Sequence, residues 1–471
     1  MTRPPLAGAT AALRGAALTF AADPFLVPSH DALRHEPDAL VVLAEGRIVA
    51  FGPAAEWLPA LPPGTPVTRY DRALIVPGFI DTHVHYPQLP VVAAYGKTLL
   101  EWLDDYTYVA EQRFADPAFA AHVAEAFLDQ SLAHGTTTAM VYGTVHAASV
   151  DAFFAAAGRR GLRMIAGKVL MDRHAPASLT DTAQSGYDDS RALIGRWHGR
   201  GRLGYAITPR FAPTSTPAQL DAAGALLREH PGVWLQTHLA ENHDEIAWVA
   251  RLFPGARDYL DVYARHGLVG RRSVFGHGIH LAEDAWRRLH EAGAAIAHCP
   301  TSNTFLGSGL FRLREARRAS RPVRVGLATD VGGGTTLSML ATMGEAYKVA
   351  RMAGAPVDAA QLLWLATEGA AQALDLGGNI GTLAPGADAD IAVLDLDATP
   401  LLRFRMPFCR DVHEQLAVLT LAGDDRAVRA VWSGGRCVHD RGGAASWPTG
   451  PTGAAGAAGC GGEGGAGAAL R

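Results

Sequence analysis

Short hydrophobic runs recur through the central part of the chain, and stretches with helical character separate them. Apolar runs of this length, bounded by turn residues, are typical of strands that are buried on both faces. Strands that alternate with helices over roughly 250 residues predict an α/β fold, a (β/α)8 TIM-like barrel, with a doubly wound open sheet as the competing architecture. The eight predicted strands are Leu74–Phe79, Thr136–Val141, Arg163–Met171, Gly204–Thr208, Val233–Thr237, Ser273–Gly276, Ala294–Ala297 and Val323–Ala328.

Helix boundary signals support this alternation. Asp116-Pro117 is a typical helix start, and Gly135 follows the predicted end of that helix. Thr216-Pro217-Ala218-Gln219 resembles a capping box with proline at the first helical position. A further helix is expected to end at Ala292-Gly293.

Strand-like patterns also occur near both ends of the chain. The runs 39–44 and 47–51, joined by Glu45-Gly46, predict a β-hairpin. Similar runs occupy 389–396, 428–432 and 436–439. Because isolated two-stranded sheets are only marginally stable, we expect both ends to build one small, β-sandwich-like domain rather than two separate sheets.

These patterns divide the chain into four parts. Residues 1–76 and 381–440 form the two halves of the small β-domain, and residues 77–380 form the barrel. Residues 441–471 are dominated by glycine and alanine, with few side chains able to form a core. We expect this tail to be disordered.

Composition narrows the classes of partner. The chain has 471 residues, a formal net charge of -4 and 19% charged residues. It therefore lacks the basic surface expected of a nucleic-acid-binding protein or of one held at an acidic membrane, and no apolar stretch reaches the length of a membrane span. The cysteines, which show no Cys-x-x-Cys pair, fit a reducing compartment, and we expect a cytoplasmic protein. They are Cys299, Cys409, Cys437 and Cys460.

Metal-ligating side chains follow several of the predicted strands. In a barrel, catalytic groups lie at the carboxyl ends of the strands, so these side chains are expected to meet at one mouth. Imidazoles and a carboxylate without a thiolate suit zinc or iron(II). For each histidine alone, a structural hydrogen-bonding role is the alternative; the joint placement favours a metal site. The residues are His83, His85, His238, His277 and Asp330.

Glu241 lies three residues beyond His238. A carboxyl group beside a metal-activated water can move protons between that water and a leaving group. The alternative is a glutamate in the first turn of a helix, where the helix dipole favours negative charge. Proximity to the predicted metal favours the catalytic role.

Together these motifs resemble the amidohydrolase superfamily of metal-dependent deaminases, and more narrowly its guanine deaminases. The likeness extends from about Ala39 to Val438 and excludes the Gly/Ala-rich tail. The superfamily motifs are 77–85, 237–241, His277, 298–303 and 329–334. The narrower likeness lies in 99–103 with 106–107, in 167–169 with 171–172, and in 208–211.

The resemblance implies one zinc ion per subunit, with iron(II) as an alternative, held by His83, His85, His238 and Asp330. It implies that His277 orients the hydrolytic water and that Lys168 does not carry a metal-bridging carbamate. It places Gln88, Arg210 and Phe211 in the purine pocket, where His238 and Glu241 also contact the substrate. It suggests a homodimer.

The implied reaction is hydrolysis of guanine to xanthine and ammonia, a step of purine catabolism. Zinc acidifies water, Asp330 accepts the proton with help from His277, and Glu241 protonates N3 and then the departing amine. Arg210 can donate to O6 and N7 of guanine, whereas adenine presents an amino donor at that edge. Two alternatives stay open: deamination or hydrolysis of an oxidised purine, a pterin or a triazine, and a scaffold protein that has lost catalysis.

Overall fold

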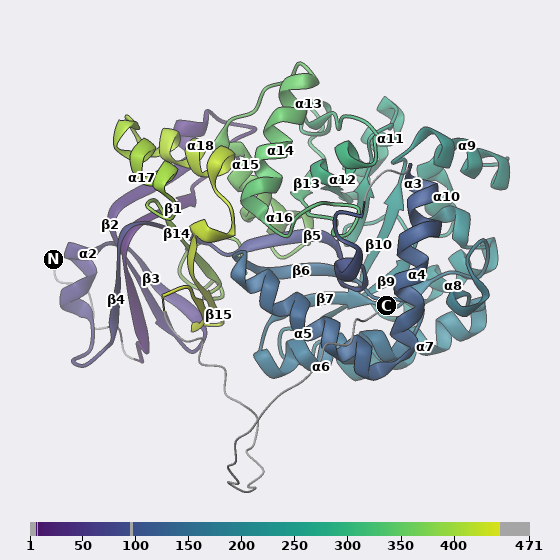
Figure 1. Cartoon of the computed structure of the whole chain (residues 1–471), viewed down its shortest axis with the longest axis horizontal. Helices are drawn as coiled ribbons and strands as arrows, with labels where there is room; N and C mark the ends of the chain where they lie inside the picture. Colours follow the sequence, from purple (N-terminus) through teal and green to yellow (C-terminus); the bar gives the residue numbers. More distant parts are fainter. Residues whose placement is uncertain (1–5, 7, 95–97, 443–471) are drawn as a thin grey trace, which may run out of the picture.

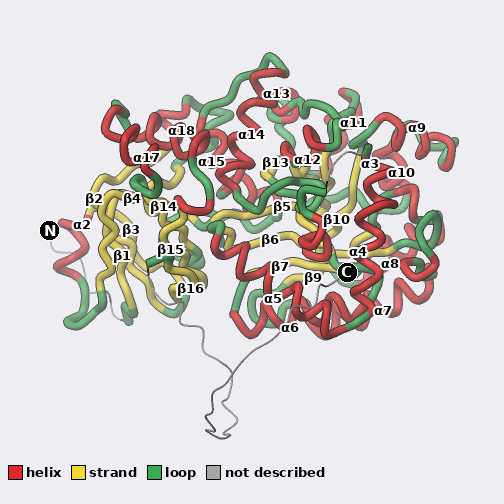
Figure 2. Tube along the Cα trace, viewed as in Figure 1, coloured by secondary structure: helices red, strands yellow, loops and turns green. Residues whose placement is uncertain are grey.

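Two β-sheets lie side by side in the computed structural model, which describes residues 6, 8–94 and 98–442 (Figure 1). Helices surround the larger sheet, while the smaller sheet contains strands from both ends of the chain (Figure 2). Nearly all of the predicted Gly/Ala-rich tail, residues 443–471, lies outside the described residues. Within the described ranges, no helix is both long enough and apolar enough to cross a membrane.

The larger sheet is the predicted barrel. Eight parallel strands follow each other in the order β13-β12-β11-β10-β9-β7-β6-β5, and β8 pairs with β9. Contacts beyond β13 close the ring onto β5: the Asp330 N–H donates to the His83 carbonyl over 2.9 Å, and the His85 N–H donates to Val331 over 2.8 Å. The strands are β5 (Phe79–His85), β6 (Thr136–Tyr142), β7 (Arg163–Gly167), β8 (Val169–Leu170), β9 (Gly204–Pro209), β10 (Trp234–Leu239), β11 (Ser273–His277), β12 (Ala295–His298) and β13 (Arg324–Leu327).

Two predicted strands differ from the structure. The run 74–79 was expected to be the first barrel strand, but it is split at Pro77-Gly78, and its first part ends β4 (Val67–Pro77) of the small sheet. The first barrel strand is β5, which contains His83 and His85 instead of preceding them. The predicted strand 163–171 breaks at Lys168 into β7 and β8. At Gly167, β7 approaches β9 so closely that a Cβ added there would lie 1.7 Å from the Ala206 carbonyl oxygen.

The helices begin and end where the boundary signals predicted. Asp116 caps α5 by accepting from the Ala118 N–H, and Thr216 caps α8 by accepting from the Gln219 N–H. Gly293 follows α11 in the left-handed conformation, with φ of 63°. The barrel helices are α5 (Pro117–Ala133), α6 (Ala147–Arg160), α7 (Ala183–Trp197), α8 (Pro217–Glu229), α9 (His243–Leu252), α10 (Tyr259–Arg265), α11 (Glu283–Ala292), α12 (Pro300–Phe305), α14 (Met339–Met352), α15 (Ala359–Ala366) and α16 (Glu368–Ala373).

The remaining helices occupy connections and the region beside the small sheet. Two of them, α3 and α4, follow β5 and lie over one mouth of the barrel, while α17 and α18 lie beside the small sheet (Figure 1). They are α1 (Ser29–Ala32), α2 (Ala54–Trp57), α3 (Leu99–Trp102), α4 (Tyr108–Gln112), α13 (Leu313–Ala316), α17 (Pro400–Arg405) and α18 (Val412–Ala422).

The small sheet joins both ends of the chain, as predicted. Its strands follow the order β16-β15-β14-β4-β1-β2-β3, and the N-terminal hairpin is formed by β2 and β3. N- and C-terminal segments meet where β4 pairs antiparallel with β14. The strands not yet given are β1 (Ala11–Phe20), β2 (Leu33–Ala44), β3 (Arg47–Pro53), β14 (Ile391–Asp395), β15 (Val428–Ser433) and β16 (Arg436–Asp440).

One core serves both ends of this sheet. Val41 and Ile48 from the N-terminal hairpin cluster with Ile391, Val393 and Trp432 from the C-terminal strands. The hairpin end also bonds directly to the C-terminal half, since the Ile48 N–H donates to the Ala387 carbonyl over 2.9 Å. The sheet therefore curls around a shared apolar core, which neither half could bury alone.

A buried ion-pair network fastens the barrel to the small sheet. Arg202, just before β9, donates from Nη1 to both carboxylate oxygens of Asp390 at 2.9 and 2.8 Å, and to Asp388 at 3.2 Å. Its Nη2 donates to the Ser433 hydroxyl over 2.7 Å. Asp390 is only 2% exposed, so its charge depends on these partners.

We expect Arg202→Ala to destabilise the protein by about 3–5 kcal/mol, because it leaves the buried Asp390 carboxylate without its counter-ion. Urea denaturation would measure the change. The control is Arg69→Ala, which breaks an exposed ion pair with Asp71 and is expected to leave stability nearly unchanged. Equal effects of the two substitutions would contradict this account of the junction.

Candidate active site

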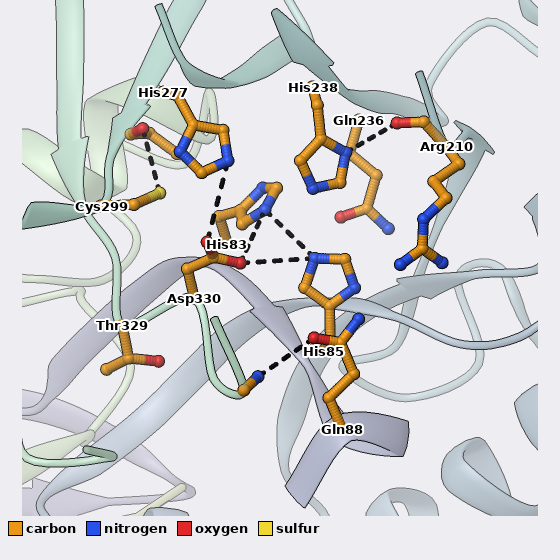
Figure 3. Close-up of polar contacts among 12 residues, drawn as sticks. His83, His85, Gln88, Arg210, Gln236, His238, His277, Cys299, Thr329 and Asp330 are labelled. Carbon is orange, nitrogen blue, oxygen red and sulfur yellow. Dashed lines mark hydrogen bonds and ion pairs between the residues drawn. The ribbon is translucent and has the colours of Figure 1, made fainter. Parts of the chain in front are cut away.

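Four of the predicted metal ligands come together at the mouth of the barrel. His83 and His85 project from β5, His238 from β10, and Asp330 follows β13 (Figure 3). One ligand atom from each of the four lies within 4.8 Å of the others. Asp330 Oδ1 is 3.2 Å from His83 Nε2 and 3.4 Å from His85 Nε2. His83, His85 and Asp330 are buried and His238 is partly exposed, so bulk water screens the charges of the cluster only weakly.

The donor atoms of this cluster fit a divalent cation. The Nε2 atoms of His83 and His85 face each other at 3.3 Å. His238 Nδ1 donates to the Arg210 carbonyl over 2.6 Å, which leaves the Nε2 lone pair available. Burial lowers the pKa of His85 to about 3 and, together with the neighbouring histidines, holds the pKa of His238 well below its usual value. Neutral imidazoles gathered around a carboxylate are the ligands expected for zinc or iron(II).

Asp330 stays ionised in this setting. Burial acts to raise its pKa, but the contacts with His83, His85 and His277 outweigh burial and hold the pKa well below its usual value. The backbone adopts a left-handed conformation at Asp330 and at His277, with φ of 50° and 68°. Such angles are uncommon outside glycine and are typical of functional sites, where surrounding structure must hold them.

A second, overlapping group includes a thiol. His83, His277, Cys299 and Asp330 also offer ligand atoms within 4.8 Å of one another. Burial raises the pKa of the Cys299 thiol well above its usual value, and the charge of Asp330 raises it further. Since a metal ligand must be the thiolate, the neutral thiol makes this second group the weaker candidate.

His277 and Glu241 lie beside the metal cluster. His277 Nδ1 is 2.8 Å from Asn303 Oδ1, while its Nε2 is 3.3 Å from Glu241 Oε2 and 3.7 Å from Asp330 Oδ2. Burial and the charge of Asp330 raise the pKa of Glu241 to about 8. At neutral pH the Glu241 carboxyl therefore carries a proton that it can donate.

Two residues that the sequence analysis did not single out hold Glu241 in place. The Ser308 hydroxyl donates to Glu241 Oε1 over 2.8 Å. Glu245 Oε2 accepts from the backbone N–H of Glu241 over 2.9 Å, and Tyr259 donates to the other Glu245 oxygen over 2.7 Å. The capping box of α9 predicts a contact of Glu245 with the Asn242 N–H, one residue after Glu241. No local signal in the sequence connects Ser308 with Glu241.

Above these groups lies a cavity with about 420 Å³ of empty space, which is partly open to solvent. All five residues predicted to contact the purine line it: Gln88, Arg210, Phe211, His238 and Glu241. Its lining combines polar groups with apolar side chains. The lining residues are His85, Gln88, Leu99, Trp102, Leu103, Arg210, Phe211, His238, Glu241, His277, Ser302, Leu306, Asp330 and Gly333.

A buried carboxylate, Glu111, contacts both predicted polar purine ligands. Arg210 Nη1 donates to its two oxygens at 3.0 and 2.9 Å, and Gln88 Nε2 donates to Oε1 over 3.0 Å. The sequence analysis missed Glu111. Its available signal is helical spacing, because buried Thr107 and Phe114 lie four residues before and three residues after it, on the same helical face.

Lys168 is paired with a carboxylate. Its Nζ is 2.5 Å from Asp181 Oδ2 and 3.4 Å from the Val169 carbonyl oxygen. That Lys168 does not bridge two metals stays a prediction.

Comparison with known proteins identifies the family. Residues 74–438 match the model of the amidohydrolase family. A guanine deaminase from Escherichia coli (strain K12) is 48% identical over 410 residues, which cover 87% of this chain and 93% of that protein. A structure of E. coli guanine deaminase superimposes with a TM-score of 0.89 at 46% identity, covering 92% of this chain and all of that one.

A structure of guanine deaminase from C. acetobutylicum, with guanine bound in its active site, has a TM-score of 0.81 at 25% identity. It covers 91% of this chain and 99% of that one. The resemblance to guanine deaminases noted in the sequence is thereby confirmed, and the chain belongs to the amidohydrolase family.

Proposed function

We propose that this protein is a zinc-dependent hydrolase that deaminates guanine to xanthine and ammonia. The observation that carries the proposal is the pairing, in one cavity, of a His/Asp metal cluster with a buried arginine. Arg210 is 3% exposed and lines the same cavity as His85, His238 and Asp330. The 48% identity to the E. coli guanine deaminase supports guanine as the substrate.

The proposed binding of guanine uses three residues. Arg210 donates to O6 and N7, the two acceptors that distinguish guanine at that edge. Gln88 forms a further hydrogen bond to the edge of the base. Phe211, which is buried and lines the cavity, stacks against the ring. Together these contacts would direct C2 and its amino group toward the metal cluster.

The chemical step requires proton transfers that Asp330, His277 and Glu241 are placed to make. A divalent metal held by His83, His85, His238 and Asp330 would supply a Lewis acid that makes water a stronger acid. We assign to Asp330 the acceptance of the proton from the attacking water. His277, whose Nε2 is 3.7 Å from Asp330 Oδ2, would orient that water. As the C2–O bond forms, Glu241 delivers its proton to N3 of guanine.

Glu241 then completes the cycle in this scheme. A proton passed from Asp330 through Glu241 reaches the exocyclic amine, the C2–N bond breaks, and ammonia leaves. The C2 hydroxyl then becomes the carbonyl of xanthine, and its proton returns to Glu241, which restores the starting state. The Ser308 hydroxyl holds Glu241 Oε1, so that Oε2 remains on the side facing His277. The net reaction consumes guanine and one water and yields xanthine and ammonia.

We expect the purified protein to consume guanine, seen as loss of guanine absorbance, and to turn over adenine at least about a hundredfold more slowly. The physical reason is that adenine presents an amino donor to the buried arginine and leaves the arginine's hydrogen bonds unmade. The panel contains adenine, 8-oxoguanine, a pterin and a triazine. If guanine stays intact while another member of the panel reacts, guanine is not the substrate, but the reaction class is retained. If no member reacts, the result favours a scaffold protein.

Three finer assignments stay proposals. Zinc is favoured over iron(II) by family resemblance, and a homodimer by the same resemblance. A cytoplasmic location is supported by free thiols at each of the cysteines in the described ranges, namely Cys299, Cys409 and Cys437. The boundaries of the catalytic barrel at residues 77 and 380 also stay a prediction.

A further inference from the structure

Glu111 is the most deeply buried carboxylate on the substrate side of the cavity. It lies on α4, directly after a π-helical turn, η3 (Leu103–Thr107), and its exposed fraction is 0%. Burial of a carboxylate is costly unless charged and polar partners compensate it. Here the partners are Arg210 and Gln88, both of which line the cavity.

The contacts of Gln88 fix the direction of its amide group. A carboxylate only accepts hydrogen bonds, so the Gln88 NH2 must face Glu111, at 3.0 Å. On the other side, the Gly332 N–H donates to Gln88 Oε1 over 3.2 Å. Both contacts require the same orientation, and rotating the amide by 180° would break both. The second N–H of Gln88 Nε2 is left for a ligand.

Arg210 is fixed by the same carboxylate. Its Nη1 contacts both Glu111 oxygens, and the Tyr108 ring lies 5.4 Å from its guanidinium carbon. Among the residues that the structure describes, no acceptor is hydrogen-bonded to Nε or Nη2 of Arg210. Those N–H groups remain available on a guanidinium whose charge is already balanced.

We infer that Glu111 is the positioning residue that sets substrate selectivity: its carboxylate holds Arg210 and Gln88 so that both present hydrogen-bond donors to the ligand. This inference rests on the proposed function. Acceptors such as O6 and N7 of guanine satisfy these donors, whereas an amino group at position 6 opposes them. Glu111 itself does not touch the reacting atoms.

The test compares wild type with Glu111→Gln on guanine and on 2,6-diaminopurine, which carries an amino group in place of O6. A neutral amide at position 111 can donate as well as accept, so Gln88 is free to rotate and Arg210 loses its partner. We expect KM for guanine to rise roughly tenfold to a hundredfold with kcat little changed. The preference for guanine over 2,6-diaminopurine should fall by roughly tenfold or more.

The matched control is Glu291→Gln, which removes an arginine-paired glutamate from the surface of α11. It should leave KM and the preference unchanged. Unchanged KM and preference in Glu111→Gln would overturn the inference, and so would a fall in kcat alone. Wild type that does not consume guanine would overturn the proposed function and this inference with it.

A second variant, Glu111→Asp, tests the inference if Glu111→Gln does not fold. Glu111→Asp keeps the charge that Arg210 requires but is one methylene shorter and cannot reach both partners. We expect it to keep the wild-type metal content and thermal midpoint, with a raised KM and a reduced preference for guanine. Wild-type values of KM and preference in Glu111→Asp would overturn the inference even if Glu111→Gln does not fold.

Discussion

Replacing Glu241 by glutamine is expected to lower kcat for guanine by about 10²–10⁴-fold, because the amide keeps the shape of the side chain and removes its transferable proton. Burial, and to a lesser extent the charge of Asp330, raise the pKa of this carboxyl to about 8, which favours the protonated form of the wild-type group near neutral pH. Glutamine can still accept from Ser308, as Oε1 of Glu241 does. Metal content and thermal stability should therefore stay close to wild type.

Steady-state kinetics, metal analysis and thermal unfolding should be measured on the same preparation of Glu241→Gln. Asp244→Asn provides a control three residues away, where the acidic side chain is exposed at the start of α9. Its turnover should match wild type. Near-normal turnover in Glu241→Gln would remove Glu241 from the proton relay, and loss of metal would show instead that it supports the ligand cluster.

Removal of the metal by a chelator is expected to reduce guanine turnover by about 10³-fold or more, because water at neutral pH is a poor nucleophile without a Lewis acid. It should also lower the thermal midpoint, since a cation that binds only the folded protein stabilises it. The close approach of His83 Nε2 and His85 Nε2, at 3.3 Å, provides a structural reason. Two imidazole nitrogens at this distance can both direct lone pairs toward one cation, so the cation would tie His83 to His85.

Addition of zinc or iron(II) to the chelated protein should restore both activity and the thermal midpoint, and the amount needed should be one ion per chain. Metal analysis of the untreated protein decides which ion it carries. His83→Ala is the matching variant and should not recover with either metal. Full turnover in protein shown to be free of metal would contradict the assigned cluster.

The repeating pattern of the barrel could be predicted because each buried strand is a short apolar run between helix boundary signals. One error arose where two neighbouring strands belong to different sheets. Residues 74–76 and 79–80 are apolar, and only Pro77-Gly78 separates them. Which part pairs with β14 and which with β6 depends on contacts with residues distant in sequence, and local periodicity does not contain them.

The metal cluster could be predicted because its members follow strands, and strand ends of a barrel converge. Glu111 escaped prediction because it lies on a short helix after β5, in a region where a glutamate usually faces water. Only the three-dimensional structure shows that Arg210, distant in sequence, meets it. A charged side chain is buried only where a partner compensates its charge. The burial of Glu111 therefore could not be inferred from the sequence of α4 alone.

The small sheet has a consequence for the order in which the polypeptide folds during synthesis. β4 is completed early, yet its neighbour β14 emerges from the ribosome only after every strand of the barrel has been made. Until then one edge of the N-terminal strands has no partner, and exposed edges are prone to pair with other chains. The nascent chain is therefore expected to depend on chaperone protection until its last strands arrive.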